Sequence, residues 1–271
     1  MKFFRSVTLT PENCPKDVYA EAIRLQPEGH RGSIFHLEAK PDEGENAEFV
    51  ERIVALCKER GLDNIRGAYS YLVVPHYEAH DLEAAPFLRL WTQKRMFKGI
   101  DSNKRDERGR IVLPAKEAKQ TIKIASIFPT PWLVVSSPVR RILESGDLVG
   151  IKFDEVAIKG HSIHTATEAF WELFSTITLP KMANSVVDPN PAFDPPRHIV
   201  VGAGTYGEPH YLESDLREVG RFDIAHTFER LGAGEPYGAG QPNLMVSQRF
   251  YQCCLKSKIP LEVRPVRIDP E

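Results

Sequence analysis

Two short patterns each occur twice in this chain, in the same order, and this internal repeat constrains the possible folds more than any other feature. The first pattern is PHY followed after three residues by DL, and its copies begin at residues 75 and 209. The second reads PWLVVS at residues 131–136 and PNLMVS at residues 242–247. Two matches in one order favour the duplication of a single structural unit over chance similarity.

Each copy of the second pattern is typical of a short buried strand that leads into a helix. Ser136 and Ser247 end the apolar runs, and a serine hydroxyl at this place can accept a hydrogen bond from the first helical turn. In the first copy, Ser137 and Pro138 supply the favoured N-cap and first-turn proline. Another apolar run follows about 15 residues later, which leaves room for a crossover connection. We therefore expect a strand–helix–strand element in each copy.

The two copies differ in length. Their first patterns start 134 residues apart and their second patterns 111 residues apart, so the first copy holds 23 more residues between its patterns. The surplus lies near residues 92–120, a stretch rich in lysine and arginine. A solvated hairpin loop is the simpler interpretation of this charged stretch. A loop that contacts a partner is the alternative, because loops inserted into a scaffold often carry recognition, and it is here that we look for a partner.

The spacing of apolar residues predicts the remaining elements. Apolar side chains that recur every three or four residues indicate helices, and clusters of β-branched and aromatic residues indicate strands. Helices are predicted at residues 16–25, 46–60 and 167–175, and strands at residues 3–9, 33–37, 69–74, 111–113, 121–126, 132–135, 151–158, 198–201 and 261–268. Because strands and helices are mixed without a steady alternation, we expect an α+β fold.

The density of proline indicates where the chain divides. Five prolines fall between residues 180 and 196, and each proline removes a backbone donor and restricts the residue before it. We therefore expect a linker in this stretch. The predicted organisation is an N-terminal α/β segment that packs on the first unit (1–68), a first repeat unit with the charged insertion (69–180), a proline-rich linker (181–197) and a second repeat unit (198–271).

Composition excludes several classes of function. The chain has 35 Lys and Arg against 37 Asp and Glu, a formal charge of −2 and a sequence pI of about 6.5. It therefore lacks the net basic charge typical of proteins that bind nucleic acid or a membrane surface. No apolar run is long enough to span a bilayer, and Pro11 interrupts the N-terminal apolar run before a secretory core could form. We expect a cytoplasmic protein whose four cysteines stay reduced.

One glycine pattern is similar to a nucleotide-binding loop. Residues 202–207 read GAGTYG after an apolar run. The nucleotide fingerprint requires a helix that begins within the glycines, and Pro209 follows too closely for that. We expect a tight loop, and a nucleotide-binding module that uses Gly202 to Gly207 is kept as an alternative.

Histidines and carboxylates leave an enzymatic alternative open. His76 and His80 could share a helix face and bind zinc, but Pro75 favours a turn. His161 and His164 have no acidic ligand close by in the sequence. The chain has no GxSxG nucleophile elbow, and sequence alone nominates no catalytic pair of carboxylates. A metal- or carboxylate-dependent hydrolase is therefore the second hypothesis.

The end of the chain resembles a known family. Residues 244–250 (LMVSQRF) and 263–268 (VRPVRI) resemble the end of bacterial polymorphic-toxin immunity proteins, namely immunity family eleven and the related double-CXXCG immunity proteins. In those families an apolar strand ending in Val-Ser precedes a short amphipathic helix and a final strand around Pro-Val. The resemblance covers about 25 to 30 residues in each copy. Because this chain has no paired CxxC motifs, no zinc site is implied, which favours the first group or a relative of it.

The resemblance implies a protein without catalytic residues or cofactors, which binds a cognate toxin domain and blocks it inside the producing cell. Such binding depends on complementary charge and on a few aromatic or arginine anchors. The candidate anchors on exposed loops are Trp91, Arg105, Arg108, Arg110 and Tyr237. No nucleic acid, membrane or metal partner is expected, and the oligomeric state is left open.

Overall fold

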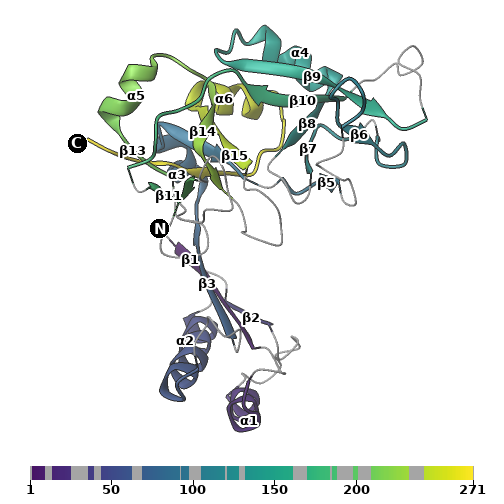
Figure 1. The fold of residues 1–271 in the computed structure, drawn as a ribbon. Helices are drawn as coiled ribbons and strands as arrows, with labels where there is room; N and C mark the ends of the chain where they lie inside the picture. The colour runs from purple at the N-terminus through teal and green to yellow at the C-terminus, as the bar shows by residue number, and fades with distance from the viewer. Residues whose placement is uncertain are drawn as a thin grey trace. The chain divides into compact units, whose positions relative to one another are not determined.

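The computed structural model divides the chain into two compact units, which are residues 1–79 and residues 80–271 (Figure 1). The described residues are 2–9, 14–25, 36–39, 44–62, 69–91, 93–97, 105–119, 121–127, 132–160, 170–183, 185–187, 198–200, 209–231 and 241–270. Both units mix helices with β-sheets, which confirms the α+β class. No helix in these ranges is long and apolar enough to cross a bilayer.

The first unit is a three-stranded antiparallel sheet with two helices packed against it. Its elements are β1 (Lys2–Leu9), α1 (Lys16–Arg24), β2 (His36–Ala39), α2 (Gly44–Glu59) and β3 (Tyr69–His76). β1 is the central strand and pairs with both β2 and β3. Because side chains alternate along a strand, Val7 and Leu9 share one face of β1, where they pack with Val18 of α1 and Ile53 of α2 in a buried core.

The larger sheet of the second unit has six strands in the order β5-β7-β8-β10-β9-β6. The elements are β5 (Met96–Phe97), β6 (Val112–Leu113), β7 (Ile124–Ile127), β8 (Leu133–Ser136), α4 (Ser137–Ser145), β9 (Ile151–Ile158) and β10 (Phe170–Ser175). Val139 and Leu143 of α4 pack on one face of the sheet. On the other face, the side chains of Phe97 on β5 and Leu113 on β6 belong to a second buried cluster. Both faces of the central strands are therefore buried.

The smaller sheet of the second unit has four strands in the order β14-β15-β4-β16, and two further strand pairs accompany it, β13 with β17 and β11 with β12. The elements are α3 (Ala79–Ala84), β4 (Phe87–Leu90), β11 (Ser185–Val187), β12 (His198–Val200), β13 (His210–Leu212), α5 (Glu213–Val219), β14 (Ile224–Leu231), β15 (Gln241–Ser247), α6 (Gln248–Lys256), β16 (Val263–Pro265) and β17 (Arg267–Asp269). Phe250 and Cys254 of α6 are buried against this sheet.

Each of the two sheets contains a strand–helix–strand element, at the places where the sequence predicts one. β8, α4 and β9 follow one another along the chain, and β10 lies between the two strands and runs antiparallel to both. β15, α6 and β16 likewise enclose β4, which runs antiparallel to β15 and to β16. In both elements, therefore, the two strands joined by the helix are parallel and are separated by one strand from elsewhere in the chain.

The two sheets of the second unit share one hydrophobic core. The two predicted repeat units therefore lie in one compact unit. Leu88 of β4, Leu133 of β8 and Val246 of β15 belong to the same buried cluster. β4 comes from the first predicted repeat unit, whereas its hydrogen-bonded neighbours β15 and β16 come from the second. β3 belongs to the N-terminal unit because it pairs with β1 along its whole length. The observed boundary thus follows residue 79 rather than residue 68.

The helix predicted at residues 167–175 is wrong, because β10 occupies its second half. The spacing of Phe170, Trp171 and Phe174 suits a helix, but a strand that is buried on both faces also carries consecutive apolar residues. Phe170 packs in the core on one face of β10, and Leu173 packs in the core on the other. Pairing with β8 and β9 on either side overrides the local periodicity.

Of the predicted linker, residues 181–197, the structure describes residues 181–183 and 185–187, and these are held in the fold. β11 pairs with β12. The backbone N–H of Ala183 donates to the carbonyl of His210 over 2.8 Å, and the side chain of Met182 is buried. Residues 188–197 lie outside the described residues. Backbone hydrogen bonds therefore tie the start of this proline-rich stretch to the second unit.

Candidate protein interface

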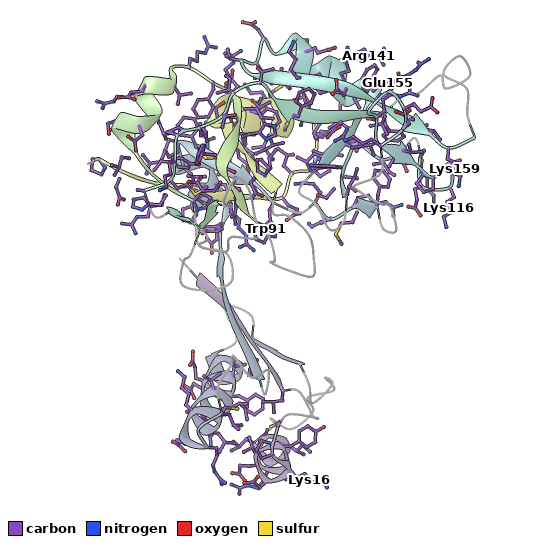
Figure 2. All side chains as sticks on the ribbon, viewed as in Figure 1. Lys16, Trp91, Lys116, Arg141, Glu155 and Lys159 are labelled. Atoms are coloured by element: carbon purple, nitrogen blue, oxygen red, sulfur yellow. The ribbon has the colours of Figure 1, made fainter. Side chains whose placement is uncertain are left out.

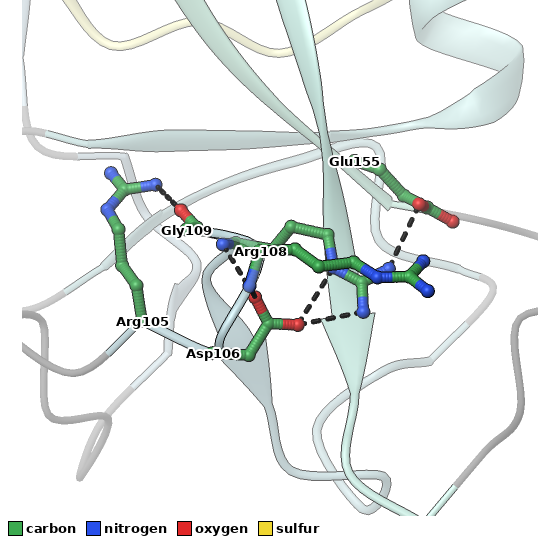
Figure 3. A network of polar contacts seen from close by, with 6 residues as sticks. Arg105, Asp106, Arg108, Gly109 and Glu155 are labelled. Atoms are coloured by element: carbon green, nitrogen blue, oxygen red, sulfur yellow. Dashed lines mark hydrogen bonds and ion pairs between the residues drawn. The ribbon is translucent and has the colours of Figure 1, made fainter.

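Arg105, the first arginine of the predicted partner loop, forms an ion pair within the protein. Its guanidinium donates two hydrogen bonds to the carboxylate of Glu172 on β10, at 2.8 and 2.9 Å. It also lies 4.5 Å from the centre of the Trp132 ring and donates to the carbonyl of Gly109 over 2.9 Å (Figure 3). Glu172 is 7% exposed, and a buried carboxylate requires a partner. Arg105 therefore compensates a buried charge, and the hydrogen bonds that it donates to Glu172 raise the pKa of Arg105.

Arg110 is also used inside the loop. Asp106 accepts hydrogen bonds from the backbone N–H groups of Arg108 and Arg110 and from the Arg110 side chain, at 3.0, 2.9 and 2.8 Å (Figure 3). Arg110 then reaches Glu155 on β9 over 3.0 Å. The side-chain hydrogen bond from Arg110 is the main reason that the pKa of Asp106 is lowered. This network closes the turn and fastens it to β9 of the six-stranded sheet.

Arg108 contributes differently from its two neighbours. Its backbone N–H takes part in the turn, whereas the residue as a whole is exposed. The turn residues around it are held by Asp106 and by Gly109, whose φ of 77° is readily accessible only to glycine. The structure therefore presents Arg108 on a rigid turn, while Arg105 and Arg110 build that turn.

Trp91, the aromatic anchor predicted from sequence, has its ring in contact with two arginines. The guanidinium of Arg89 is 4.5 Å from the centre of its ring and that of Arg264 is 3.6 Å from it. Arg89 is opposite Arg264 in the β4–β16 pairing, and residues 89 and 91 alternate onto the same face of β4. Arg89 is 2% exposed, whereas Trp91 and Arg264 are half-buried. Stacking of this kind is favourable because the ring face is electronegative.

A buried glutamine holds Trp91 in place. The Gln93 side chain donates to the carbonyls of Trp91 and Glu262, at 2.6 and 3.1 Å, and accepts from the backbone N–H of Glu262 over 3.0 Å. Its own backbone N–H donates to the hydroxyl of Ser126 on β7 over 2.8 Å. Gln93 thus connects the four-stranded sheet with the six-stranded one. Sequence reasoning missed Gln93 and Arg264, because their partners are far away along the chain.

Tyr237, the last predicted anchor, lies outside the described residues, as do Gly202 to Gly207 and the histidine pair His161 and His164. His80 is exposed and pairs with Asp81 over 3.2 Å. Across the ranges that the structure describes, no group of three or more His, Cys, Asp or Glu side chains is placed to hold a metal ion. All four cysteines are unpaired, and Cys253 alone among them is not buried.

Among the residues that the structure describes, the most deeply buried carboxylate belongs to Glu229, on a bulge of β14. The register shifts between His226 and Arg230, and the Thr227 hydroxyl closes the bulge by donating to the Glu229 carbonyl over 2.7 Å. Glu229 accepts from the backbone N–H of Met182 over 2.7 Å and is 0% exposed. Burial, and to a lesser degree the charge of Glu229, raises the pKa of Tyr211. A carboxylate so placed holds chain segments together and cannot meet a dissolved substrate.

Comparison with models of known protein families, with curated proteins and with solved structures finds no match to this chain.

Proposed function

We propose that this chain is a non-catalytic immunity protein, which binds a cognate bacterial toxin domain in the cytoplasm and blocks it. The observation that supports this most is the structure of the residues that carry the resemblance. Residues 244–250 form the end of β15 and the start of α6, and residues 263–268 form β16 and the start of β17. This is the order of strand, short helix and final strand that the resemblance implies.

An internal duplication is part of the same proposal. The resemblance applies to both copies of the second pattern, and both copies begin a strand–helix–strand element with one antiparallel strand inserted between the parallel pair. α4 and α6, the two helices of these elements, bury residues in one common core. A duplicated unit whose first copy contributes β4 to the sheet of the second, and whose copies share a core, would account for this arrangement.

The contacts of two buried carboxylates favour binding over catalysis. Glu172 pairs with Arg105, and Glu229 accepts a backbone hydrogen bond from Met182. General acid–base catalysis requires carboxylates that reach a substrate, whereas these two fix neighbouring segments. Of the predicted anchors that the structure describes, Arg108 is exposed, and Trp91, Arg105 and Arg110 are half-buried. Aromatic and arginine side chains contribute most to protein interfaces.

The decisive experiment is co-expression in bacteria with the C-terminal domain of a secreted protein encoded in the adjacent reading frame. Expression of this chain is expected to restore growth, and the two proteins are expected to co-purify. A second arm uses Trp91→Ala, expected to weaken the complex by roughly tenfold or more, with Lys181→Ala as an exposed control. Absence of both rescue and co-purification with the native chain would refute the proposal.

A further inference from the structure

A row of exposed basic residues connects the two sheets of the second unit, and we refer to it as the basic strip. Its members are Lys94, Arg95, Lys116, Lys119, Lys123, Lys159 and Lys258. Hydrogen bonds and ion pairs show that its segments are neighbours. Arg95 pairs with Glu117 over 3.2 Å, and Lys123 donates to the carbonyl of Lys258 over 2.8 Å. The backbone N–H of Lys159 donates to the carbonyl of Leu113, just before the loop that carries Lys116.

The strip has an excess of positive charge. The acidic residues within four positions of its members along the chain are Glu117, Glu155 and Glu262. All three are already paired, Glu117 with Arg95, Glu155 with Arg110 and Glu262 with Lys94. Lys116 and Lys119 are exposed and lie on either side of Glu117 along the chain. Arg105 and Arg110, by contrast, are neutralised by buried or half-buried carboxylates. The net charge of −2 over the whole chain therefore conceals a locally basic surface.

One end of the basic strip lies beside Trp91, whose ring is in contact with Arg89 and Arg264. The backbone N–H of Trp91 donates to the carbonyl of Glu262 over 2.9 Å, and Glu262 pairs with Lys94 at the start of the strip. In Figure 2 Trp91 and Lys116 lie along one edge of the second unit, and Arg141 on α4 lies away from Lys116. An aromatic residue fixed by Gln93 beside a row of lysines combines a rigid anchor with a steering charge.

We propose that the basic strip binds an acidic segment of a protein partner, with Trp91 at one end of the contact. This inference rests on the proposed function, because it names the charge of the partner surface. A polypeptide suits the strip better than nucleic acid does. Glu117 and Glu262 pair with Arg95 and Lys94 and so leave gaps in the row of available charges. A phosphate backbone carries a charge at every nucleotide, whereas a peptide can place its carboxylates beside the remaining lysines only. The acidic balance of the whole chain also opposes long-range attraction of nucleic acid.

The test compares two charge-reversed double variants of equal net charge. Lys116→Glu with Lys119→Glu changes the strip, and Arg141→Glu with Lys152→Glu changes exposed residues elsewhere in the second unit. Binding of a fluorescent polyglutamate peptide and of duplex DNA is measured at low salt and at about 0.15 M salt, where screening acts over about 8 Å. We expect the strip variant to bind the peptide at least roughly tenfold more weakly and the control variant to change less than about twofold.

Equal weakening by both double variants would overturn the inference, since net charge alone would then explain the binding. DNA binding that is tighter than peptide binding and is lost in the strip variant would overturn it in favour of a nucleic-acid surface. The co-expression assay separates this inference from the proposed function. Rescue by the native chain and by the strip variant alike would leave the proposed function in place and refute the strip. Peptide binding that depends on the strip, without rescue by the native chain, would support the strip and refute the proposed function.

Discussion

Gly150 lies directly against the backbone of Ile224, where the two sheets of the second unit meet. A Cβ atom added at Gly150 would be 2.4 Å from the carbonyl oxygen of Ile224 and 2.9 Å from the side chain of Ile177. The φ of Gly150 is 92°, a conformation that other residues rarely adopt. The preceding carbonyl, of Val149, accepts from the N–H groups of Asp223 and Ile224 at 2.9 and 3.2 Å. A glycine is thus required for this close approach.

Gly150→Ala is expected to lower the free energy of unfolding by about 3 kcal/mol or more, because both backbone strain and a backbone clash result. Gly160→Ala is the matched control, since its φ of 81° is similar but nothing lies within 4 Å of the added atom. The control should lose only about 1 kcal/mol. Urea unfolding of the two variants measures the difference. Equal losses would show that the sheets do not approach each other at Gly150.

The two recurring serines are expected to differ in their contribution to stability. Ser247 accepts from the N–H of Phe250 over 3.2 Å and donates to Asp223 over 2.7 Å, whereas Ser136 occupies the same N-cap position without a side-chain capping bond. Ser247→Ala should therefore lower the free energy of unfolding by about 1–2 kcal/mol, and Ser136→Ala by less. Thermal or urea unfolding distinguishes them, and a larger loss for Ser136→Ala would contradict the assignment.

Arg105→Ala should destabilise the protein by about 3 kcal/mol, because the buried Glu172 carboxylate would lose its partner. Arg108→Ala, three residues away on the exposed side of the same turn, should change stability by less than about 0.5 kcal/mol. The double variant Arg105→Met with Glu172→Gln removes the charge together with its partner and should recover part of the loss. Urea unfolding of all three provides the measurement, and a failure of the double variant to recover would count against the ion pair.

His226 should make stability depend on pH near neutrality. Its ring accepts from the N–H of Ser175 over 3.2 Å, and burial lowers its pKa, although Glu172 opposes this. The unfolded chain takes up the proton near pH 6.5, whereas the folded chain resists it. The contribution of neutral His226 to the free energy of unfolding is therefore complete above about pH 6.5. It is lost as the pH falls toward the lower pKa of the folded state, by up to about 1.4 kcal/mol per pH unit.

His226→Gln is expected to flatten this dependence between pH 7 and pH 5, because an amide does not titrate and can still accept from Ser175. The native protein, measured in parallel, gives the slope with which the variant is compared. The free energy of unfolding in urea at several pH values provides the test. An unchanged slope in His226→Gln would assign the dependence to other groups.

Cys253 is expected to be the cysteine that reacts first in the folded protein. Burial raises the pKa of Cys57 to about 11 and that of Cys254 to about 12, and the thiolate is the reactive form. Cys253 is partly exposed. Alkylation by iodoacetamide at pH 8, followed by peptide mass analysis, should label Cys253 first. Rapid labelling that persists in Cys253→Ser would show that a buried cysteine is accessible.

Several elements were predictable because their signals are local. The serine after each apolar run marks the end of a strand and the start of a helix, and α4 and α6 begin one residue after Ser136 and Ser247. β9 spans the predicted residues 151–158. Capping and side-chain alternation act over a few neighbouring residues, so a single stretch of sequence is sufficient to reveal them.

The candidate interface was predictable only in part. The sequence points to a charged loop and to Trp91, and the structure places Trp91 in a half-buried stack. That Arg105 neutralises Glu172, 67 residues away, has no local signal, because an arginine that binds a partner and one that pairs internally look alike in sequence. The basic strip likewise combines lysines from separate segments.

By itself, the sequence determined the α+β class and the positions of the two strand–helix–strand elements, because hydrophobic period and helix caps are properties of adjacent residues. Only the tertiary structure decided that residues from Phe170 onward form a strand, that β10 separates β8 from β9, and that β4 separates β15 from β16. These features depend on hydrogen bonds between strands far apart in the chain, and such long-range pairing outweighs the local periodicity that a sequence shows.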